Sequence, residues 1–397
     1  MKKYIWLLVS FVYIFLVYLV IRYTPVTAAL QNDAQTFVDL ANHPFQAKHF
    51  IDLGYPVALH YLKLLTGQNN VIAMQILNYF FWVCGTYFIY LSIRSMKSLL
   101  TIPASYLMLF SPLLLTFSAK LYSEPLSALG VALLVYGLSV GITWPLVLGV
   151  IIVVTTKSIF FPGIILLGLY LLFNHLHHRG IAILITSILL LPYFLSSMGG
   201  GRTLYNLAIE RAKLDLRYDQ ILACVPYYLS YPAGQYLLPQ YEGVCRQNDV
   251  IDSLPGAQQN PYKTASAYRD QGFTYLDWVK SVVSQPLKYL LIFLVGLFNL
   301  ALFEGVYPSI LLQLPSLVVG LCYLVFKLVL NLYLWSRIYL VSKKTPILFI
   351  PFIYLFIVIG NFQVEPRYIY PLIPYVYFLV GISKNILSSA RKDDNHQ

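Results

Sequence analysis

Residues 71–93 read VIAMQILNYFFWVCGTYFIYLSI, and this stretch contains no Asp, Glu, Lys or Arg. A helix needs about 20 mostly apolar residues to cross the hydrocarbon core of a bilayer, so the stretch is long enough to do so. Arg94 and Lys97 follow it directly. Because cations gather on the cytoplasmic side of membrane helices, the stretch predicts a spanning helix whose C-terminal end faces the cytoplasm.

Apolar windows of similar length recur along the rest of the chain. They cover residues 4–21, 99–118, 125–141, 158–173, 181–198, 284–303, 308–330, 345–362 and 368–383. Two further stretches, 142–157 and 327–342, are shorter or interrupted by polar residues, so each is either another crossing or an extension of its neighbour. We therefore predict an all-α polytopic membrane protein with about ten to thirteen transmembrane helices in one domain, residues 1–397.

The composition agrees with this prediction, and the position of the charges orients the chain. Hydrophobic residues make up 58% and charged residues 11% of the sequence, whereas soluble domains carry about 25% charged residues. The net charge of +11 lies in and beside the apolar windows, while two polar loops, 22–70 and 198–285, are each close to neutral. This distribution argues against nucleic acid as a partner and predicts that both loops face outward from a cytoplasmic membrane. The apolar run after Lys2 and Lys3 is too long for a signal peptide, so we expect it to be a retained first helix.

Both loops carry helical patterns. In the first loop, residues 33–41 and 56–65 predict two short amphipathic helices lying on the outer leaflet, with Lys63 toward the outside. In the second loop, a predicted helix over residues 203–218 leaves Arg211, Lys213 and Arg217 available to the lipid surface. Cys224 and Cys245 lie in this loop and could pair in an oxidising compartment, although spacing alone does not fix their connectivity.

Few ionisable residues fall at membrane depth, and such residues are functional candidates because burying charge in lipid is costly. Glu124 opens one apolar window four residues after Lys120, Lys157 interrupts VVTTKSIFFPG, and Glu365 and Arg367 precede the last window. Each of them could instead reach the interface or pair locally, as Lys120 with Glu124 along one helix face.

Several short motifs occur in a characteristic order. These are NDAQTFVDLA, GYPVALHYLKLLTG, YSEPLSALGVALLVYGL, TTKSIFFPGIILL and EPRYIYPLIPYVYFL. Together they resemble the GT-C superfamily of polytopic glycosyltransferases, in particular the branch of protein mannosyltransferases and aminoarabinose transferases. The resemblance extends over nearly the whole chain in order and topology.

This resemblance implies an inverting glycosyltransferase that moves a sugar from a polyprenyl-phosphate carrier to an acceptor hydroxyl at the outer membrane face. It implies that Asp33, in the first loop, is the general base, although Asp33 also suits a helix N-cap. The leaving phosphate needs cations. The candidates for binding it are Arg367, Lys157, Arg202 and Arg211, and those for lining the substrate cavity are Glu124, Lys120 and Glu365.

The expected partners are the lipid-linked sugar, a glycan, lipid or protein acceptor, and membrane lipids, without cofactor or metal. Ala34 follows Asp33 where protein mannosyltransferases have a second acid, which disfavours a protein acceptor. The first loop also lacks an Asp-x-Asp pair, so a metal site is not supported there. The alternative function is a transporter or flippase of a lipid-linked glycan, but the sequence does not show the two related halves typical of many transporters.

Overall fold

The computed structural model describes residues 2–24, 26–30, 33–44, 53–67, 70–198, 202–229, 244, 261–302, 317–353 and 366–394. Within these ranges the chain forms helices and no β-strand, which confirms the predicted all-α class. Three helical stretches are long and apolar enough to cross a membrane: Val71–Ser95, His177–Leu195 and Leu321–Lys343. A fourth candidate is bent by 101° at its break, and six other apolar helices are shorter.

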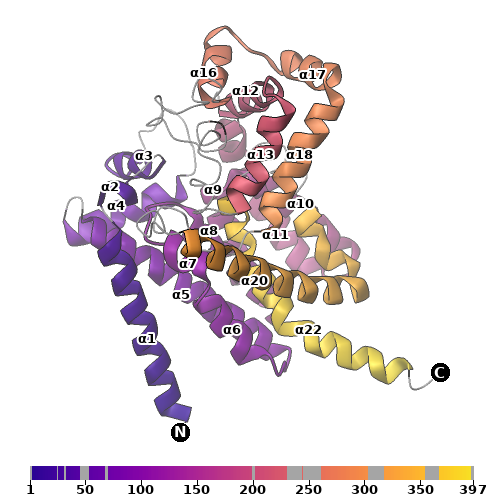
Figure 1. Ribbon diagram of the computed structural model, residues 1–397. Coiled ribbons are helices and arrows are strands. Elements are labelled where there is room, and N and C mark those ends of the chain that lie inside the picture. The colour runs from indigo at the N-terminus through magenta and orange to yellow at the C-terminus, as the bar shows by residue number, and fades with distance from the viewer. Residues whose placement is uncertain are drawn as a thin grey trace.

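The N-terminal half is a bundle of packed helices (Figure 1). Its members are α1 (Lys2–Tyr23), α5 (Val71–Ser95), α6 (Thr101–Leu109), α7 (Pro112–Phe117), α8 (Glu124–Val140), α9 (Thr143–Thr156), η1 (Ser158–Phe160), α10 (Phe161–Phe173) and α11 (His177–Met198). The ambiguous stretch 142–157 is thus a helix of its own, α9. The stretch 327–342 is instead the continuation of one long helix, α20 (Leu317–Lys344).

The helices α8 and α9 form a tight hairpin. Gly141 makes the turn with a φ of 87°, a left-handed conformation that favours glycine. A Cβ atom on Gly149 would lie 2.7 Å from the carbonyl oxygen of Gly130, so the two backbones touch through small residues, as in many membrane helix pairs. At the turn, Arg179 of α11 donates a hydrogen bond to the Leu138 carbonyl. The opposite end of the hairpin, where α8 begins and α9 ends, is therefore remote from this basic turn.

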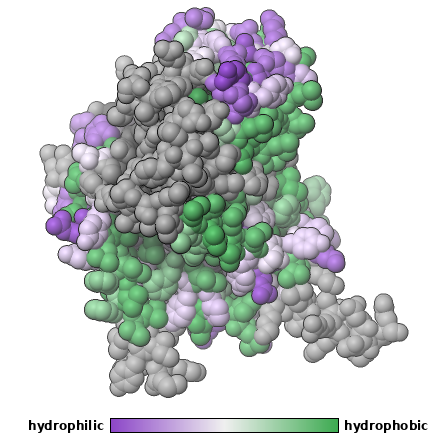
Figure 2. All heavy atoms as spheres, viewed as in Figure 1, coloured by the Kyte–Doolittle hydropathy of each residue, from purple (hydrophilic) through white to green (hydrophobic). Residues whose placement is uncertain are grey.

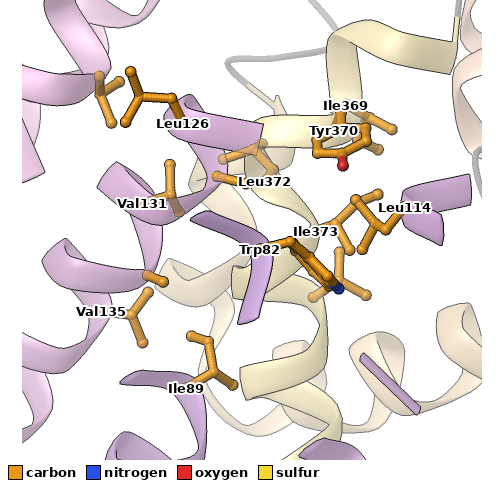
Figure 3. Close-up of a cluster of buried hydrophobic side chains, with 14 of the residues drawn as sticks. Trp82, Ile89, Leu114, Leu126, Val131, Val135, Ile369, Tyr370, Leu372 and Ile373 are labelled. Atoms are coloured by element: carbon orange, nitrogen blue, oxygen red, sulfur yellow. The ribbon is translucent and has the colours of Figure 1, made fainter. Parts of the chain in front are cut away.

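The core of the bundle is built around Trp82 in the middle of α5 (Figure 3). Trp82 is fully buried and meets Tyr370 edge-on, with 6.3 Å between the ring centroids. Tyr370 belongs to η5 (Pro366–Leu372), which leads into α22 (Ile373–Asp394). The C-terminal segment is thus packed into the first half of the chain, consistent with one domain.

The first loop contains the two predicted helices, α3 (Asp33–Leu40) and α4 (Gly54–Thr66), after the short α2 (Val26–Ala29). The expected orientation of Lys63 is wrong. Its ammonium is buried and donates to the Val38 carbonyl at 2.7 Å and to Asn42 Oδ1 at 2.9 Å. These two acceptors lie in and just after α3, so Lys63 joins the helices to each other. The neighbouring Leu64 and Leu65 are the exposed residues.

We expect Lys63→Met to destabilise the first loop by about 1–3 kcal/mol, because it removes the donor and leaves two acceptors without it. Hydrogen exchange of α3 and α4 would measure the change. Leu64→Met, on the exposed side of the same helix, is the matched control and should leave exchange unchanged. Equal exchange in Lys63→Met and wild type would contradict a joining role for Lys63.

The second loop forms a separate cluster of helices. They are α12 (Arg202–Leu214), α13 (Tyr218–Leu229), α16 (Pro261–Asp270) and α17 (Tyr275–Ser284), followed by α18 (Pro286–Ala301). The predicted helix 203–218 is therefore two helices with a turn after Leu214.

Outside this loop, the short 3-10 helix η4 (Pro346–Phe349) follows α20.

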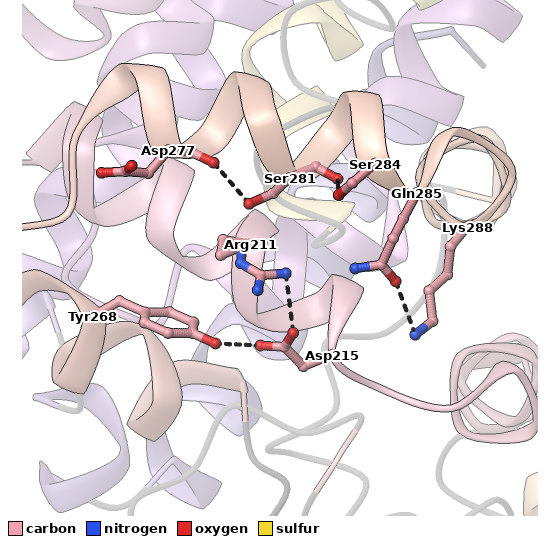
Figure 4. A network of polar contacts seen from close by, with 8 residues as sticks. All are labelled: Arg211, Asp215, Tyr268, Asp277, Ser281, Ser284, Gln285 and Lys288. Atoms are coloured by element: carbon pink, nitrogen blue, oxygen red, sulfur yellow. Dashed lines mark hydrogen bonds and ion pairs between the residues drawn. The ribbon is translucent and has the colours of Figure 1, made fainter.

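Two of the cations predicted to face lipid from α12 are engaged inside this cluster. The Nζ atom of Lys213 lies 2.8 Å from Glu210 Oε1, and both side chains are buried. Arg211 lies 3.0 Å from Asp215 Oδ1, and Asp215 also accepts a hydrogen bond from the hydroxyl of Tyr268 on α16 (Figure 4). The prediction failed because acids close by in the sequence neutralise these cations locally.

Burial raises the pKa of Glu210, and the charge of Lys213 only partly opposes this effect. An acid whose pKa is raised on folding adds stability that is complete below its unfolded pKa, about 4.3 for Glu, and is lost as pH rises through the folded pKa. We therefore expect the wild-type protein to lose protection from hydrogen exchange in α12 as pH rises from the unfolded pKa to the folded pKa of Glu210. A Glu210→Gln variant should not show this loss. A difference between the two proteins that does not change with pH would contradict the shifted titration.

Cys224 of α13 is disulfide-bonded. Cys84 and Cys322 are free thiols, and the chain has four cysteines. Cys245 lies outside the described residues.

Candidate functional site

A buried ion pair lies at the end of the α8–α9 hairpin opposite the basic turn. Glu124 is the first residue of α8, and Lys157 follows the last residue of α9. Their side chains are 1% and 11% exposed, and Lys157 Nζ lies 3.0 Å from Glu124 Oε1. Because the helices are antiparallel, two residues far apart in the sequence meet at one end of the hairpin.

The chain enters Glu124 through an irregular segment, residues 118–123, that is wholly buried. Buried carbonyl groups need hydrogen-bond donors, and amide side chains of α5 supply them. Gln75 donates to the Ala119 carbonyl at 2.7 Å, and Asn78 donates to the Lys120 carbonyl at 2.7 Å. The two amides thus hold in place the segment that positions Glu124.

The first loop closes over this segment through Tyr55 of α4. The hydroxyl of Tyr55, which is fully buried, donates to Asn78 Oδ1 at 2.9 Å. Burial raises the pKa of Tyr55; the hydrogen bond with Asn78 opposes the shift, and the nearby charge of Glu124 adds to it. Tyr55 therefore connects the first loop to the buried acid.

Tyr193 of α11 fixes the start of α4 against the end of α9. Its hydroxyl donates to the Thr155 carbonyl and accepts from the Leu53 amide, both at 3.0 Å. A Cβ atom on Gly54 would lie 2.5 Å from Thr155 Oγ1, so only glycine allows this approach. Thr155 lies just before Lys157 in the chain. The first loop is therefore anchored beside the buried cation.

The carboxylate of Glu124 retains unused hydrogen-bonding capacity. Although Lys157 Nζ is close to Oε1, neither oxygen accepts a well-aligned hydrogen bond from the described residues. A carboxylate can accept about four hydrogen bonds, and burial makes an unsatisfied one costly. Glu124 therefore keeps hydrogen-bonding capacity directly beside the ammonium of Lys157.

The elements that carry the other predicted residues converge here. Asp33 is the first residue of α3, whose Phe37 packs edge-on against Tyr55 with 5.6 Å between centroids. Arg367 is the second residue of η5, and η5 packs against α8. Tyr370, also in η5, shares a hydrogen bond between its hydroxyl and that of Ser118. The side chains of Asp33 and Arg367 lie outside the described residues, as does Glu365 altogether.

The remaining predicted residues have other positions. Lys120 is buried in the irregular segment, not on a helix face shared with Glu124, and its ammonium lies 5.9 Å from the ring centroid of Tyr122. Arg211 is held by Asp215 in the second loop. Arg202 is the first residue of α12, and its side chain lies outside the described residues.

Sequence reasoning missed the residues that assemble the site. Gln75 and Asn78 interrupt an otherwise apolar window at a spacing that places them on one helix face. Polar side chains in apolar helices usually face the protein interior, so this signal was available. Tyr55 and Tyr193 carried no such signal, because tyrosines are spread throughout the sequence.

Comparison of the chain with protein-family models, with curated proteins and with solved structures gave no match.

Proposed function

We propose that the chain is a multi-pass protein of the cytoplasmic membrane that transfers a sugar, with inversion, from a polyprenyl-phosphate carrier to an acceptor hydroxyl at the outer face. The observation that carries the proposal is the Glu124–Lys157 pair. It combines a hydroxyl acceptor with a cation at the end of a hairpin whose α9 packs against α4 of the first loop and whose α8 packs against η5.

The membrane assignment is supported by the surfaces of the long helices. Phe80 on α5, Ile188 on α11 and Val325 on α20 are large apolar side chains that are more than half exposed. Soluble proteins rarely expose extensive apolar surface of this kind, whereas a bilayer would cover it. Leu64 and Leu65 at the end of α4 are exposed in the same way, which suits a first loop resting on the outer leaflet.

In the proposed reaction, Asp33 takes the proton of the acceptor hydroxyl as its oxygen bonds to the anomeric carbon. The bond between that carbon and the phosphate oxygen breaks, and polyprenyl phosphate leaves with the electron pair. Lys157 and Arg367 would stabilise the charge that develops on the phosphate, while Glu124 would accept a hydroxyl of the bound sugar.

Transfer can be tested with the protein purified and reconstituted in liposomes with a radiolabelled polyprenyl-phosphate sugar. We expect release of polyprenyl phosphate and appearance of label on a lipid, glycan or peptide acceptor supplied outside. Movement of intact labelled lipid between leaflets without cleavage would favour the transporter or flippase. Neither cleavage nor movement with any of a panel of donors and acceptors would argue against both.

A further inference from the structure

The helix α17, at the end of the second loop, has two unlike faces. Leu276, Val279 and Val283 lie within one third of its circumference at about 100° per residue, and Leu276 and Val283 are 60% and 72% exposed. The other side, with Ser281 buried and Trp278 half-buried, packs on α12. The exposed apolar stripe therefore has no cover among the described residues of the chain.

The stripe continues onto α18. The two helices meet at Gln285 with a bend of 101°, so α17 lies across the end of α18 (Figure 1). Leu287, Leu290 and Leu294, spaced for one face of α18, are at least half exposed. In Figure 2, hydrophobic side chains run down the right edge of the molecule where α17 turns into α18, below a hydrophilic top.

We propose that α17 is an in-plane membrane helix, with its Leu and Val stripe inserted at the boundary between headgroups and acyl chains of the outer leaflet. The inference rests on the membrane assignment made above and adds a surface to it. The axes of α17 and α18 are nearly perpendicular. If the axis of α18 runs along the membrane normal, the axis of α17 is therefore parallel to the membrane surface. The exposed apolar surface of α18 then enters the lipid without interruption.

The charges next to the stripe suit a headgroup region. Lys280 is exposed and lies about 40° beyond Leu276 around the helix, from where its ammonium can reach lipid phosphates. Asp277 is turned to the N-terminus, where its carboxylate accepts from the Thr274 hydroxyl and amide at 2.6 and 3.0 Å. The acid is thereby kept off the apolar stripe.

This arrangement would fix the height of the second loop above the bilayer. The buried side of α17 contacts α12, and α12 in turn packs against α16. The Arg211–Asp215 ion pair and the hydrogen bond from Tyr268 to Asp215 join α12 to α16. An in-plane α17 therefore holds the helices of the second loop at the membrane surface, where a lipid-linked donor presents its sugar.

The test uses the full chain with Cys84 and Cys322 replaced by Ser and the disulfide kept, carrying a single fluorophore on Val283→Cys. The protein is reconstituted in phosphatidylcholine vesicles containing nitroxides placed either near the headgroup or deep in the acyl chains. We expect a larger loss of fluorescence with the shallow nitroxide than with the deep one. Asp219→Cys, on the exposed first turn of α13, should be quenched by aqueous iodide instead.

A label at Phe80→Cys, on the exposed side of α5, separates the two assignments. If deep nitroxides quench it but neither nitroxide quenches Val283→Cys, α17 does not touch lipid and the proposal is overturned. If deep nitroxides quench Val283→Cys more strongly than shallow ones, α17 is part of a transmembrane segment and the in-plane position is wrong. If Phe80→Cys is not quenched at all, the membrane assignment itself fails.

Discussion

Lys157→Met is expected to lower the free energy of unfolding by about 3–5 kcal/mol, since it leaves a buried carboxylate without its counter-charge. Glu124 is 1% exposed, and Lys157 is its ion-pair partner. Methionine matches the length of the lysine stem, so the change removes the charge with little change in packing. Thermal unfolding of the purified protein in detergent would measure the loss.

The double variant Glu124→Gln, Lys157→Met distinguishes a charge effect from simple loss of packing. Removing both charges relieves the desolvation cost, so we expect the double variant to be more stable than Lys157→Met alone. Lys343→Met, at an exposed end of α20, serves as a control and should not alter unfolding. A double variant as unstable as the sum of both single variants would mean that the two charges do not interact.

The helical class and the first-loop helices were predictable from the sequence because apolar periodicity determines them locally. The extent of α20 was not predictable from the sequence. A run of 28 residues can form one long helix or two short spans with the same composition. Lys63 and Arg211 were misplaced for one reason. A cation beside an apolar stripe was assumed to face outward, whereas nearby carbonyl or carboxylate groups satisfy both cations inside the loops.

The candidate site was predictable only in part. Glu124 and Lys157 stood out singly as charges in apolar windows, but their contact depends on how α8 and α9 pair. A sequence does not reveal the pairing of helices when every helix is apolar on all sides. The anchors at Tyr55 and Tyr193 depend on the same tertiary arrangement, because each hydroxyl bridges segments far apart in the chain.

Asp33→Asn is expected to reduce sugar transfer by about 10²–10⁴-fold, the usual contribution of a positioned general base. An amide cannot take the proton of the acceptor hydroxyl at neutral pH. Asp and Asn have similar helix propensities, so α3, whose first residue is Asp33, should remain intact. The rate would be measured in the liposome assay with saturating donor.

The substitution therefore separates the two roles that Asp33 can have. The structure makes Asp33 the first residue of α3 and not the residue before it, as an N-cap would be. If Asp33 only stabilises this helix end, then Asp33→Asn preserves the transfer rate and costs at most about 0.3–1 kcal/mol of stability. If Asp33 is the base, Asp33→Asn lowers transfer by about 10²–10⁴-fold while donor binding persists. Asp39→Asn is the matched control, since Asp39 lies on the same helix, exposed, and accepts a hydrogen bond from Gln35 at 2.8 Å. Its transfer rate should equal that of the wild type, because an exposed acid on the far turn of α3 has no part in the proposed proton transfer.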